Sequence, residues 1–287
     1  MNDMLDASAT AGPAPFHWVR RNLGTITGAT LCSIVILIAV AAPYLTSVDP
    51  NKQNLMLALM PPGPDHLLGT DQYGRDVLSR IIWGAQISVQ VAVLSTLLAM
   101  IVGGIIGLIS GYYGGWIDSV VMRVMDALLS FPTLIFGLIV VALIGSEVYH
   151  LIIAIALTSV APFARIARAP VLSLKEQAFM EAGRALGFSD ARLIFRHLLP
   201  NIVSQMLIMS SLWMASAVRT EASLAFVGLG VPPPTATWGG MMRDGFTYIL
   251  EAPWLTIWPG LMILIFIMGL SILGDSLGDR IDTRDQD

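Results

Sequence analysis

Charged residues are scarce in this sequence, and their scarcity argues against a soluble fold. Asp, Glu, Lys and Arg make up 13% of the 287 residues, whereas hydrophobic residues make up 55%. A typical soluble domain carries about 25% charged residues. The composition therefore indicates a protein embedded in a lipid bilayer, and the net charge of −4 argues against nucleic-acid binding.

Cysteine, histidine and lysine are also rare, and each scarcity excludes a class of chemistry. The single cysteine, Cys32, lies in an apolar run, so the chain can form no internal disulfide or redox pair. The four histidines are scattered without metal-ligand spacing, and we expect no bound metal or cofactor. Lys52 and Lys175 are the only lysines, and neither belongs to the GKS or GKT of a P-loop. Any ATP hydrolysis must therefore belong to another subunit.

Six apolar runs are each long enough to cross a bilayer, which requires about 20 helical residues. We predict membrane spans near residues 23–45, 87–109, 117–144, 150–172, 202–227 and 254–273. The predicted fold is an all-α membrane protein with six transmembrane helices. Arg20 and Arg21 before the first run leave a cleavable signal peptide open as an alternative, with Ala39–Ala41 as its cleavage site.

The polar stretches divide the chain into four predicted parts. Residues 1–22 are a cytoplasmic N-terminal tail, and residues 278–287 are a cytoplasmic C-terminal tail. Residues 23–86 hold the first span and a periplasmic segment that ends in a short helix lying flat at the membrane surface. Residues 87–277 form a five-helix core, which includes a polar elbow at residues 174–201.

Glycine and proline mark particular positions within the spans. Gly103, Gly107, Gly111 and Gly115 fall four residues apart, a spacing that favours close packing of one helix against another. Pro132 lies inside the third predicted span and is expected to kink it.

Two pairs of charged residues stand out inside predicted spans, where an unpaired charge is costly. Arg123 and Asp126 are three residues apart, so they can neutralise each other on one helix face. Arg219 and Glu221 are two apart and cannot face each other on a regular helix. We expect both to face a transport pathway or a seam between subunits rather than lipid.

The elbow from Leu174 to Asn201 is polar but is patterned like folded structure. Phe179, Ala182, Gly183 and Leu186 recur at helical spacing and should share one face of a first short helix. Gly187 follows the last of these and suits a left-handed helix cap.

A second short helix is predicted to follow in the elbow. Ser189 is its expected N-cap, and Pro200 is expected to end it. Its apolar face comprises Ala191, Ile194, Phe195 and Leu198. The elbow is thus predicted to be a helix–glycine–helix unit.

The distribution of Lys and Arg predicts the orientation of the chain. Six spans place both termini and the elbow on one side of the membrane. That side holds Arg20, Arg21, Arg165, Arg168, Lys175, Arg184, Arg192, Arg196, Arg280 and Arg284. The other side holds Lys52, Arg75, Arg80 and Arg243. Because basic residues gather on the cytoplasmic side, we predict that the termini and the elbow are cytoplasmic.

The elbow resembles a known signature. Glu181-Ala182-Gly183, then Gly187, then the LLPN of residues 198–201 resemble the EAA motif of ABC-importer permeases, with glycine at the third position instead of the usual alanine. The resemblance implies that the elbow is a coupling helix that docks onto an ATPase subunit. The docking residues it implies are Glu181, Ala182, Gly183, Arg184, Ala185, Leu186 and Gly187.

Two further runs resemble the dipeptide, oligopeptide and nickel permease family. They are GTDQYGRDVLSR at residues 69–80 and EASLAFVGLG at residues 221–230, the second followed by PPP and TWG. Ser271 and Gly278 depart from the family pattern near the inner end of the last span. The family implies the ABC importer type I permease fold in the bacterial inner membrane, and a transport subunit rather than an enzyme.

The same resemblance implies the partners. They are a paralogous permease subunit forming a heterodimer, two ATP-binding ABC subunits, and a periplasmic or lipid-anchored solute-binding protein. Two other classes are weighed against this one. An intramembrane enzyme would need paired carboxylates or a His/Asp set at spanning depth, and a secondary transporter would show an internal repeat or several midplane charges. The sequence shows none of these features.

Overall fold

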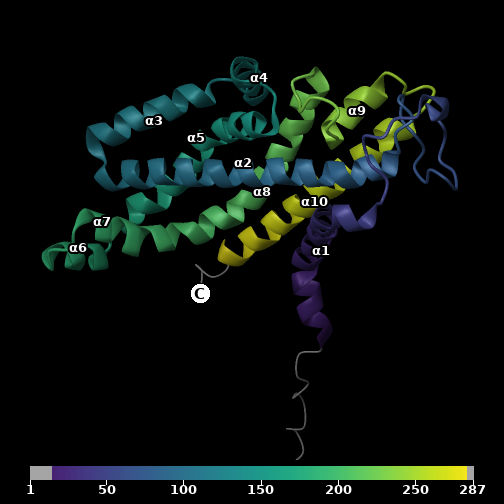
Figure 1. Ribbon diagram of the computed structural model, residues 1–287. Coiled ribbons are helices and arrows are strands. Elements are labelled where there is room, and N and C mark those ends of the chain that lie inside the picture. Colours follow the sequence, from purple (N-terminus) through teal and green to yellow (C-terminus); the bar gives the residue numbers. More distant parts are fainter. Residues whose placement is uncertain (1–14, 283–287) are drawn as a thin grey trace, which may run out of the picture.

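The computed structural model describes the backbone of residues 15–282 and the side chains of residues 22–279. Most of the two predicted terminal tails, including the side chains of Arg20, Arg21, Arg280 and Arg284, therefore lies outside the described residues. The described part is helical (Figure 1). Its elements are α1 (Pro15–Leu45), η1 (Leu55–Leu57), α2 (Val77–Tyr113), α3 (Gly115–Leu129), α4 (Thr133–Ile144), α5 (Val148–Leu174), α6 (Ala178–Ala185), α7 (Asp190–Arg192), η2 (Leu193–Leu198), α8 (Leu199–Val227), α9 (Trp238–Phe246) and α10 (Trp254–Asp282).

The helices confirm the predicted all-α membrane fold. Within the described residues, five stretches are long and apolar enough to cross a membrane, and there are six if the bent pair of α3 and α4 counts as one span. The stretches correspond to α1, α2, α5, α10 and the continuous run from Asp190 to Val227. Figure 1 shows α2 running through the middle of the molecule, with the elbow helices α6 and α7 beyond one of its ends.

The prediction of a separate surface helix before the second span is wrong. Val77–Tyr113 forms one continuous helix of 37 residues. The helix begins where the Asp76 carboxylate accepts a hydrogen bond from the Ser79 N–H at 2.7 Å. Gly84 lies within this helix and packs closely against the indole of Trp238.

The third predicted span is broken rather than gently kinked. Its two halves, α3 and α4, meet at an angle of 93°. The break lies at Pro132, as predicted, where ψ is 128° and the backbone has left the helical region. Proline has no N–H to continue the helical ladder, so α4 starts afresh after it.

The predicted glycine ridge lies at the contact between α2 and α5. A Cβ atom on Gly103 would overlap the carbonyl oxygen of Val160, and one on Gly107 would overlap that of Ala164. Glycine therefore lets the two backbones touch, as membrane helices with small residues do. Gly111 continues the ridge, whereas a Cβ on Gly115 would meet no atom within 4 Å, so Gly115 does not belong to it.

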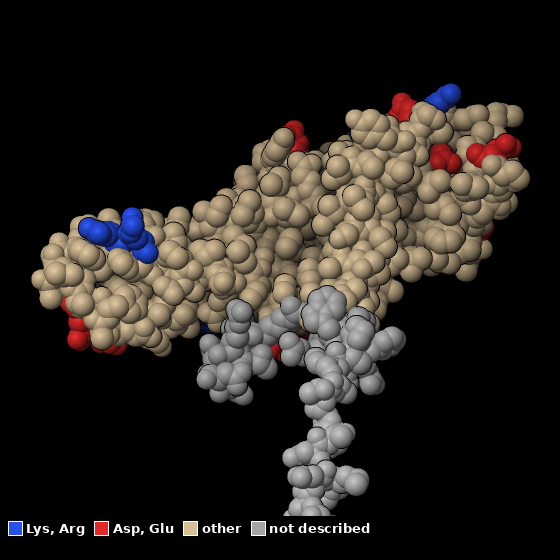
Figure 2. All heavy atoms as spheres, turned by 90° about the horizontal axis from the view of Figure 1, so that it is seen from below, with Lys and Arg blue, Asp and Glu red and all other residues tan. Residues whose placement is uncertain are grey.

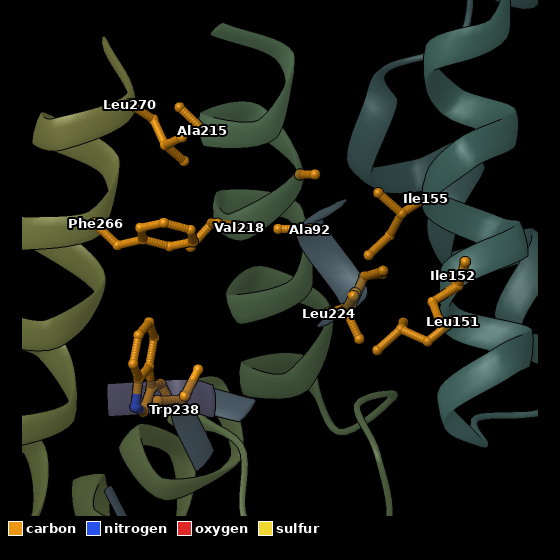
Figure 3. Packing of buried hydrophobic residues seen from close by; sticks show 14 of the residues in the cluster. Ala92, Leu151, Ile152, Ile155, Ala215, Val218, Leu224, Trp238, Phe266 and Leu270 are labelled. Carbon is orange, nitrogen blue, oxygen red and sulfur yellow. The ribbon is translucent and has the colours of Figure 1, made fainter. Parts of the chain in front are cut away.

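The apolar core lies where α2, α5, α8, α9 and α10 meet. Trp238 at the start of α9 is fully buried, and its indole N–H donates to the Ile81 carbonyl oxygen at 3.1 Å. Its ring meets Phe266 of α10 edge to face, with the ring centroids 6.2 Å apart. Figure 3 shows these two rings beside Val218 of α8, while Leu151 of α5 lies on the far side of that helix. The core therefore joins the segment after α8 to the spans.

Candidate functional site

The first half of the elbow ends in a complete glycine-capped turn. Gly187 has φ of +75°, which confirms the predicted left-handed cap. The Phe188 N–H donates to the Gly183 carbonyl oxygen at 3.0 Å, and the Gly187 N–H donates to that of Arg184 at 2.9 Å. These two bonds form a Schellman motif, which satisfies the last carbonyl groups of α6. No atom lies within 4 Å of the place a Gly187 Cβ would occupy, so the positive φ alone requires glycine there.

The second half begins as predicted but does not end at Pro200. Ser189 caps it, and its hydroxyl accepts a hydrogen bond from the Arg192 N–H at 3.4 Å. The helix then continues through the π-helical turn η2 directly into α8, so the predicted stop at Pro200 is wrong. In the wider turn the Leu199 N–H bonds to the Ile194 carbonyl oxygen, five residues back. This widening accommodates the proline ring and its missing N–H.

The two halves of the elbow pack against each other through a small apolar interior. Met180, Leu193 and Leu198 are almost fully buried. Gly183 is buried with them, and a Cβ on it would lie 2.9 Å from the Leu193 side chain. The predicted shared face of α6 is therefore divided, because Gly183 points inward while Ala182 is exposed. Phe195, predicted to lie on the apolar face of the second helix, is instead 58% exposed.

The outer surface of the elbow carries the other residues of the implied docking motif. Glu181, Ala182, Arg184, Ala185, Leu186 and Gly187 are all exposed. Leu186 is 73% exposed at the tip, beside the turn. Basic side chains gather at this end of the molecule (Figure 2). The guanidinium of Arg192 lies 3.9 Å from the centre of the Phe188 ring, which holds one of these basic groups over the turn.

The elbow is also bonded to the end of α2, which sequence reasoning missed. The Tyr112 hydroxyl donates to the Asp190 carboxylate at 2.6 Å, and the Lys175 ammonium donates to the Gly111 carbonyl oxygen at 3.1 Å. The bonded residues are 78 and 64 positions apart in the chain. No local pattern signals pairs so far apart.

The charges predicted to pair within the third span have other partners. Asp126 pairs with Arg165 of α5 at 2.5 Å, so the predicted pairing with Arg123 is wrong. Asp118 accepts two hydrogen bonds from the guanidinium of Arg168 and one from the Ser110 hydroxyl. Both ion pairs connect α3 to α5, so the charges are compensated between neighbouring helices and not along one helix.

Arg219 and Glu221 have different surroundings, in keeping with their spacing. Arg219 is exposed, whereas Glu221 is 1% exposed inside the described chain. Both carboxylate oxygens of Glu221 lie outside hydrogen-bond geometry with any donor of the described residues. Thr237, the N-cap of α9, is the polar side chain that interacts with Glu221, so the carboxyl lies near the start of α9.

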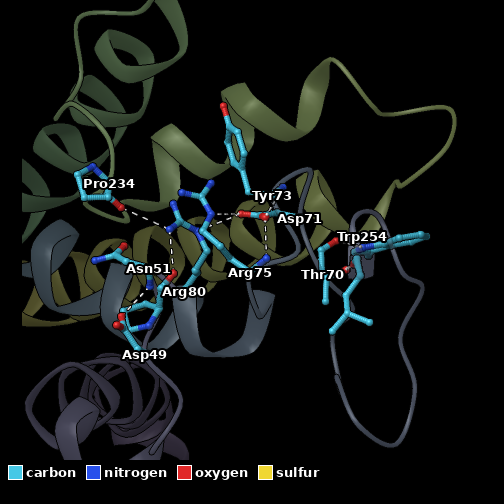
Figure 4. Close-up of polar contacts among 11 residues, drawn as sticks. Asp49, Asn51, Thr70, Asp71, Tyr73, Arg75, Arg80, Pro234 and Trp254 are labelled. Carbon is cyan, nitrogen blue, oxygen red and sulfur yellow. Dashed lines mark hydrogen bonds and ion pairs between the residues drawn. The ribbon is translucent and has the colours of Figure 1, made fainter. Parts of the chain in front are cut away.

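The GTDQYGRDVLSR run forms a buried group of charges at the other end of α2. We call Asp71, Arg75 and Arg80 the outer cluster, after the side of the membrane that the Lys and Arg distribution predicts for them. Asp71 accepts a bond from the Arg75 guanidinium at 2.6 Å and lies 3.6 Å from that of Arg80. Arg80 also donates to the carbonyl oxygens of Pro50 at 3.1 Å and Pro234 at 3.4 Å (Figure 4). The run therefore joins three segments that are far apart in the sequence.

These features define a class: a helical membrane protein whose spans are interrupted by a folded, exposed elbow. The chain belongs to the family described as "Binding-protein-dependent transport system inner membrane component", which matches residues 103–285. It is thus a membrane transport component and not an enzyme.

Relatives and a solved structure agree with this family. The chain is 37% identical to the dipeptide transport system permease protein DppC of Alkalihalophilus pseudofirmus, over 94% of this chain and 88% of that protein. It is 36% identical to the glutathione transport system permease protein GsiD of Escherichia coli O6:K15:H31, over 94% of this chain and 91% of that one. A chain of the MetNI methionine ABC transporter in an inward-facing form has the same fold, with a TM-score of 0.56 and 16% identity, over 69% of this chain and 94% of that chain.

Proposed function

We propose that this chain is the permease subunit of an ATP-driven importer for peptides or a related small solute, and that its elbow docks onto an ATPase subunit. The observation that carries the proposal is the exposed tip of the elbow, where a rigid glycine turn presents small and apolar side chains. A helix tip that enters a cleft needs small residues, because side-chain size limits how closely two backbones approach. Ala182, Ala185 and Gly187 supply them.

Within this proposal the docking residues have two roles. Glu181, Ala182, Arg184, Ala185, Leu186 and Gly187 form the contact surface. Gly183 is buried beneath that surface and positions it, because the absence of a side chain lets α6 lie close to Leu193 and Phe188. The chain has no P-loop, so ATP is hydrolysed by the partner.

The proposed assembly contains two permease halves and two ATPases. The second half is a paralogous chain, and a periplasmic or lipid-anchored binding protein delivers the solute to the outer face. ATP binding moves the elbows, and the spans alternate between access from outside and from inside. The names of the relatives, which include dipeptide and glutathione systems, support a peptide-like solute.

Retention of the ATPase tests the docking surface. The complex is purified from membranes with wild-type chain, with Ala182→Trp and with Leu207→Trp. Leu207 is 53% exposed on α8, so the control adds the same bulk outside the elbow. We expect Ala182→Trp to insert into the membrane but to lose the ATPase and the import of labelled dipeptide or glutathione. Retained ATPase with normal import would contradict docking, and import without any ATPase would favour a secondary transporter.

Thiol labelling tests the proposed orientation, in which both termini and the elbow are cytoplasmic. On a Cys32→Ala background, a cysteine at Ser47 or Thr235 should react with an impermeant reagent added outside intact cells, because both sites belong to the proposed outer segments. A cysteine at Ser189 in the elbow should react only after the membrane is opened. The reverse pattern would invert the topology.

A further inference from the structure

The contacts at the inner end of α2 reach both limbs of the elbow. We call residues 175–187 the entry limb and residues 188–201 the exit limb. The Lys175 ammonium of the entry limb donates a hydrogen bond to the Gly111 carbonyl oxygen. The Asp190 carboxylate of the exit limb accepts a hydrogen bond from the Tyr112 hydroxyl. Arg184 at the end of α6 also interacts with the Tyr112 hydroxyl. Tyr112 therefore lies where the two limbs meet α2.

The entry limb is held to α2 by much more than its hydrogen bond. It continues directly from α5, which lies backbone against backbone with α2 along Gly103 and Gly107. The exit limb continues into α8, and its support on α2 is apolar, because Leu193, Ile194 and Leu198 share one buried cluster with Leu108 of α2. Its Asp190 follows the N-cap Ser189 and is the residue whose side chain bonds to the last turn of α2. The Tyr112–Asp190 bond is thus the polar link between α2 and the start of the exit limb.

Helix α2 is suited to carry a displacement across the membrane. Its 37 residues run without a break, a length of about 55 Å at 1.5 Å per residue. At its outer end Arg80 is bonded to Pro234, in the segment between α8 and α9. A movement of α2 at the elbow would therefore displace the outer cluster and the segment between α8 and α9 that is bonded to it.

We propose that Tyr112 is a positioning residue that makes the exit limb move as one body with α2, so that elbow displacement reaches the outer end of the permease. This inference rests on the proposed docking of the elbow to the ATPase. The Tyr112 hydroxyl donates to the charged Asp190 carboxylate, and hydrogen bonds to charged groups are the stronger kind. Loss of this one bond leaves the fold of the elbow intact, because the Schellman turn and the buried Leu193 and Leu198 do not depend on it.

The test measures distances between spin labels in the full complex with its partner permease and ATPases. On a Cys32→Ala background, one label is placed at Leu97, which is 43% exposed on α2, and the other at Phe195, which is 58% exposed on the exit limb. A second pair joins Leu97 to the exposed Glu176 of the entry limb. Both pairs are measured without nucleotide and with ATP trapped by vanadate.

The expected pattern separates the two limbs. In the wild type neither distance changes when nucleotide is trapped. In Tyr112→Phe and in Asp190→Ala the distance to Phe195 shifts on trapping, the distance to Glu176 stays fixed, and the ATPase remains bound. Tyr113→Phe is the matched control, because it removes one hydroxyl from the adjacent, exposed ring and should behave like the wild type.

Three outcomes would overturn the inference. The first is a change in the Leu97–Phe195 distance in the wild type when nucleotide is trapped. The second is that both distances stay fixed in Tyr112→Phe and in Asp190→Ala. The third is loss of the ATPase from both variants, which would make the Tyr112–Asp190 bond part of the docking surface. Failure of the proposed function is distinct from these, because the wild-type complex would then fail to retain the ATPase at all.

Discussion

The polar regions at the two ends of α2 place their charges differently. In the outer cluster Asp71, Arg75 and Arg80 are 6%, 3% and 4% exposed. In the elbow, charged residues such as Glu181 and Arg184 are exposed. A buried ion pair that loses one partner leaves an uncompensated charge, which is costly. The outer cluster therefore fixes the chain's own segments, whereas exposed elbow charges such as Glu181 are accessible to the partner subunit that we propose.

The bonds that shape the two regions also differ in range. The turn of the elbow is closed by backbone bonds between residues three to five positions apart, such as Phe188 to Gly183. The outer cluster bonds Arg80 to Pro50 and Pro234, which are 30 and 154 positions away. Local closure allows the elbow to keep its shape during the movement that we propose for it, and long-range closure joins the segments around Arg80 into one unit.

The largest expected effect is on stability, from Asp71→Ala. This change removes the carboxylate shared by Arg75 and Arg80 and leaves two buried cations without it. Breaking a buried ion pair in this way costs about 3–5 kcal/mol. The measurement is thermal unfolding of the purified chain in detergent. Glu181→Ala in the elbow is the control and should change stability by about 0.5 kcal/mol or less; equal losses would erase the contrast between the two regions.

The next effect is on assembly, from Gly187→Val. Valine at φ of +75° costs about 1 kcal/mol or more and should redirect the exit limb. We expect the variant to enter the membrane but to lose its ATPase on purification. Gly278→Val is the matched control, since a Cβ there meets no atom within 4 Å and the backbone is helical. ATPase retention by Gly187→Val would show that docking tolerates a distorted turn.

Features that depend on near neighbours were predictable from the sequence. The spans follow from apolar runs, the Gly187 cap and the Ser189 N-cap from local backbone rules, and the Gly103–Gly111 ridge from a four-residue spacing. Each is specified by residues within a few turns of each other. The docking role of the elbow stays a prediction.

Features that depend on distant partners were not predictable. Asp126 was assigned to Arg123, its neighbour in sequence, but it pairs with Arg165 of another helix. The burial of Arg75 and Arg80 depends on segments that no periodicity brings together. Pro200 was expected to stop a helix, but the π turn before it relieves the clash, and no residue pattern signals such a turn.

A smaller effect distinguishes the two charges of the fifth predicted span. Glu221→Leu replaces a buried carboxyl, whose one interacting polar side chain among the described residues is Thr237, with an apolar group of similar size. It should leave stability unchanged or raise it by about 1 kcal/mol. Arg219→Leu, at an exposed position, should leave unfolding unaltered and reduce uptake if Arg219 faces the pathway. Marked destabilisation by Glu221→Leu would show that the carboxyl makes a stabilising hydrogen bond or ion pair. Normal uptake by both variants would show that neither residue takes part in the transport pathway.

The smallest effect of all is expected for the more exposed of the two ion pairs that connect α3 to α5. In the Arg165–Asp126 pair the side chains are 54% and 57% exposed, and in the Arg168–Asp118 pair they are 31% and 14% exposed. Water screens the first pair, so a double-mutant cycle with alanine should give a coupling energy of about 0.5 kcal/mol or less. The second pair is bidentate and is supported by Ser110, so its coupling should reach about 1–3 kcal/mol. Because both cycles compare the same residue types between the same two helices, their difference reports the combined effect of burial, bidentate geometry and the Ser110 hydrogen bond on a charge pair. Equal coupling energies would mean that exposure does not set the strength of ion pairs here, and the contrast between the buried outer cluster and the open elbow would then need another cause.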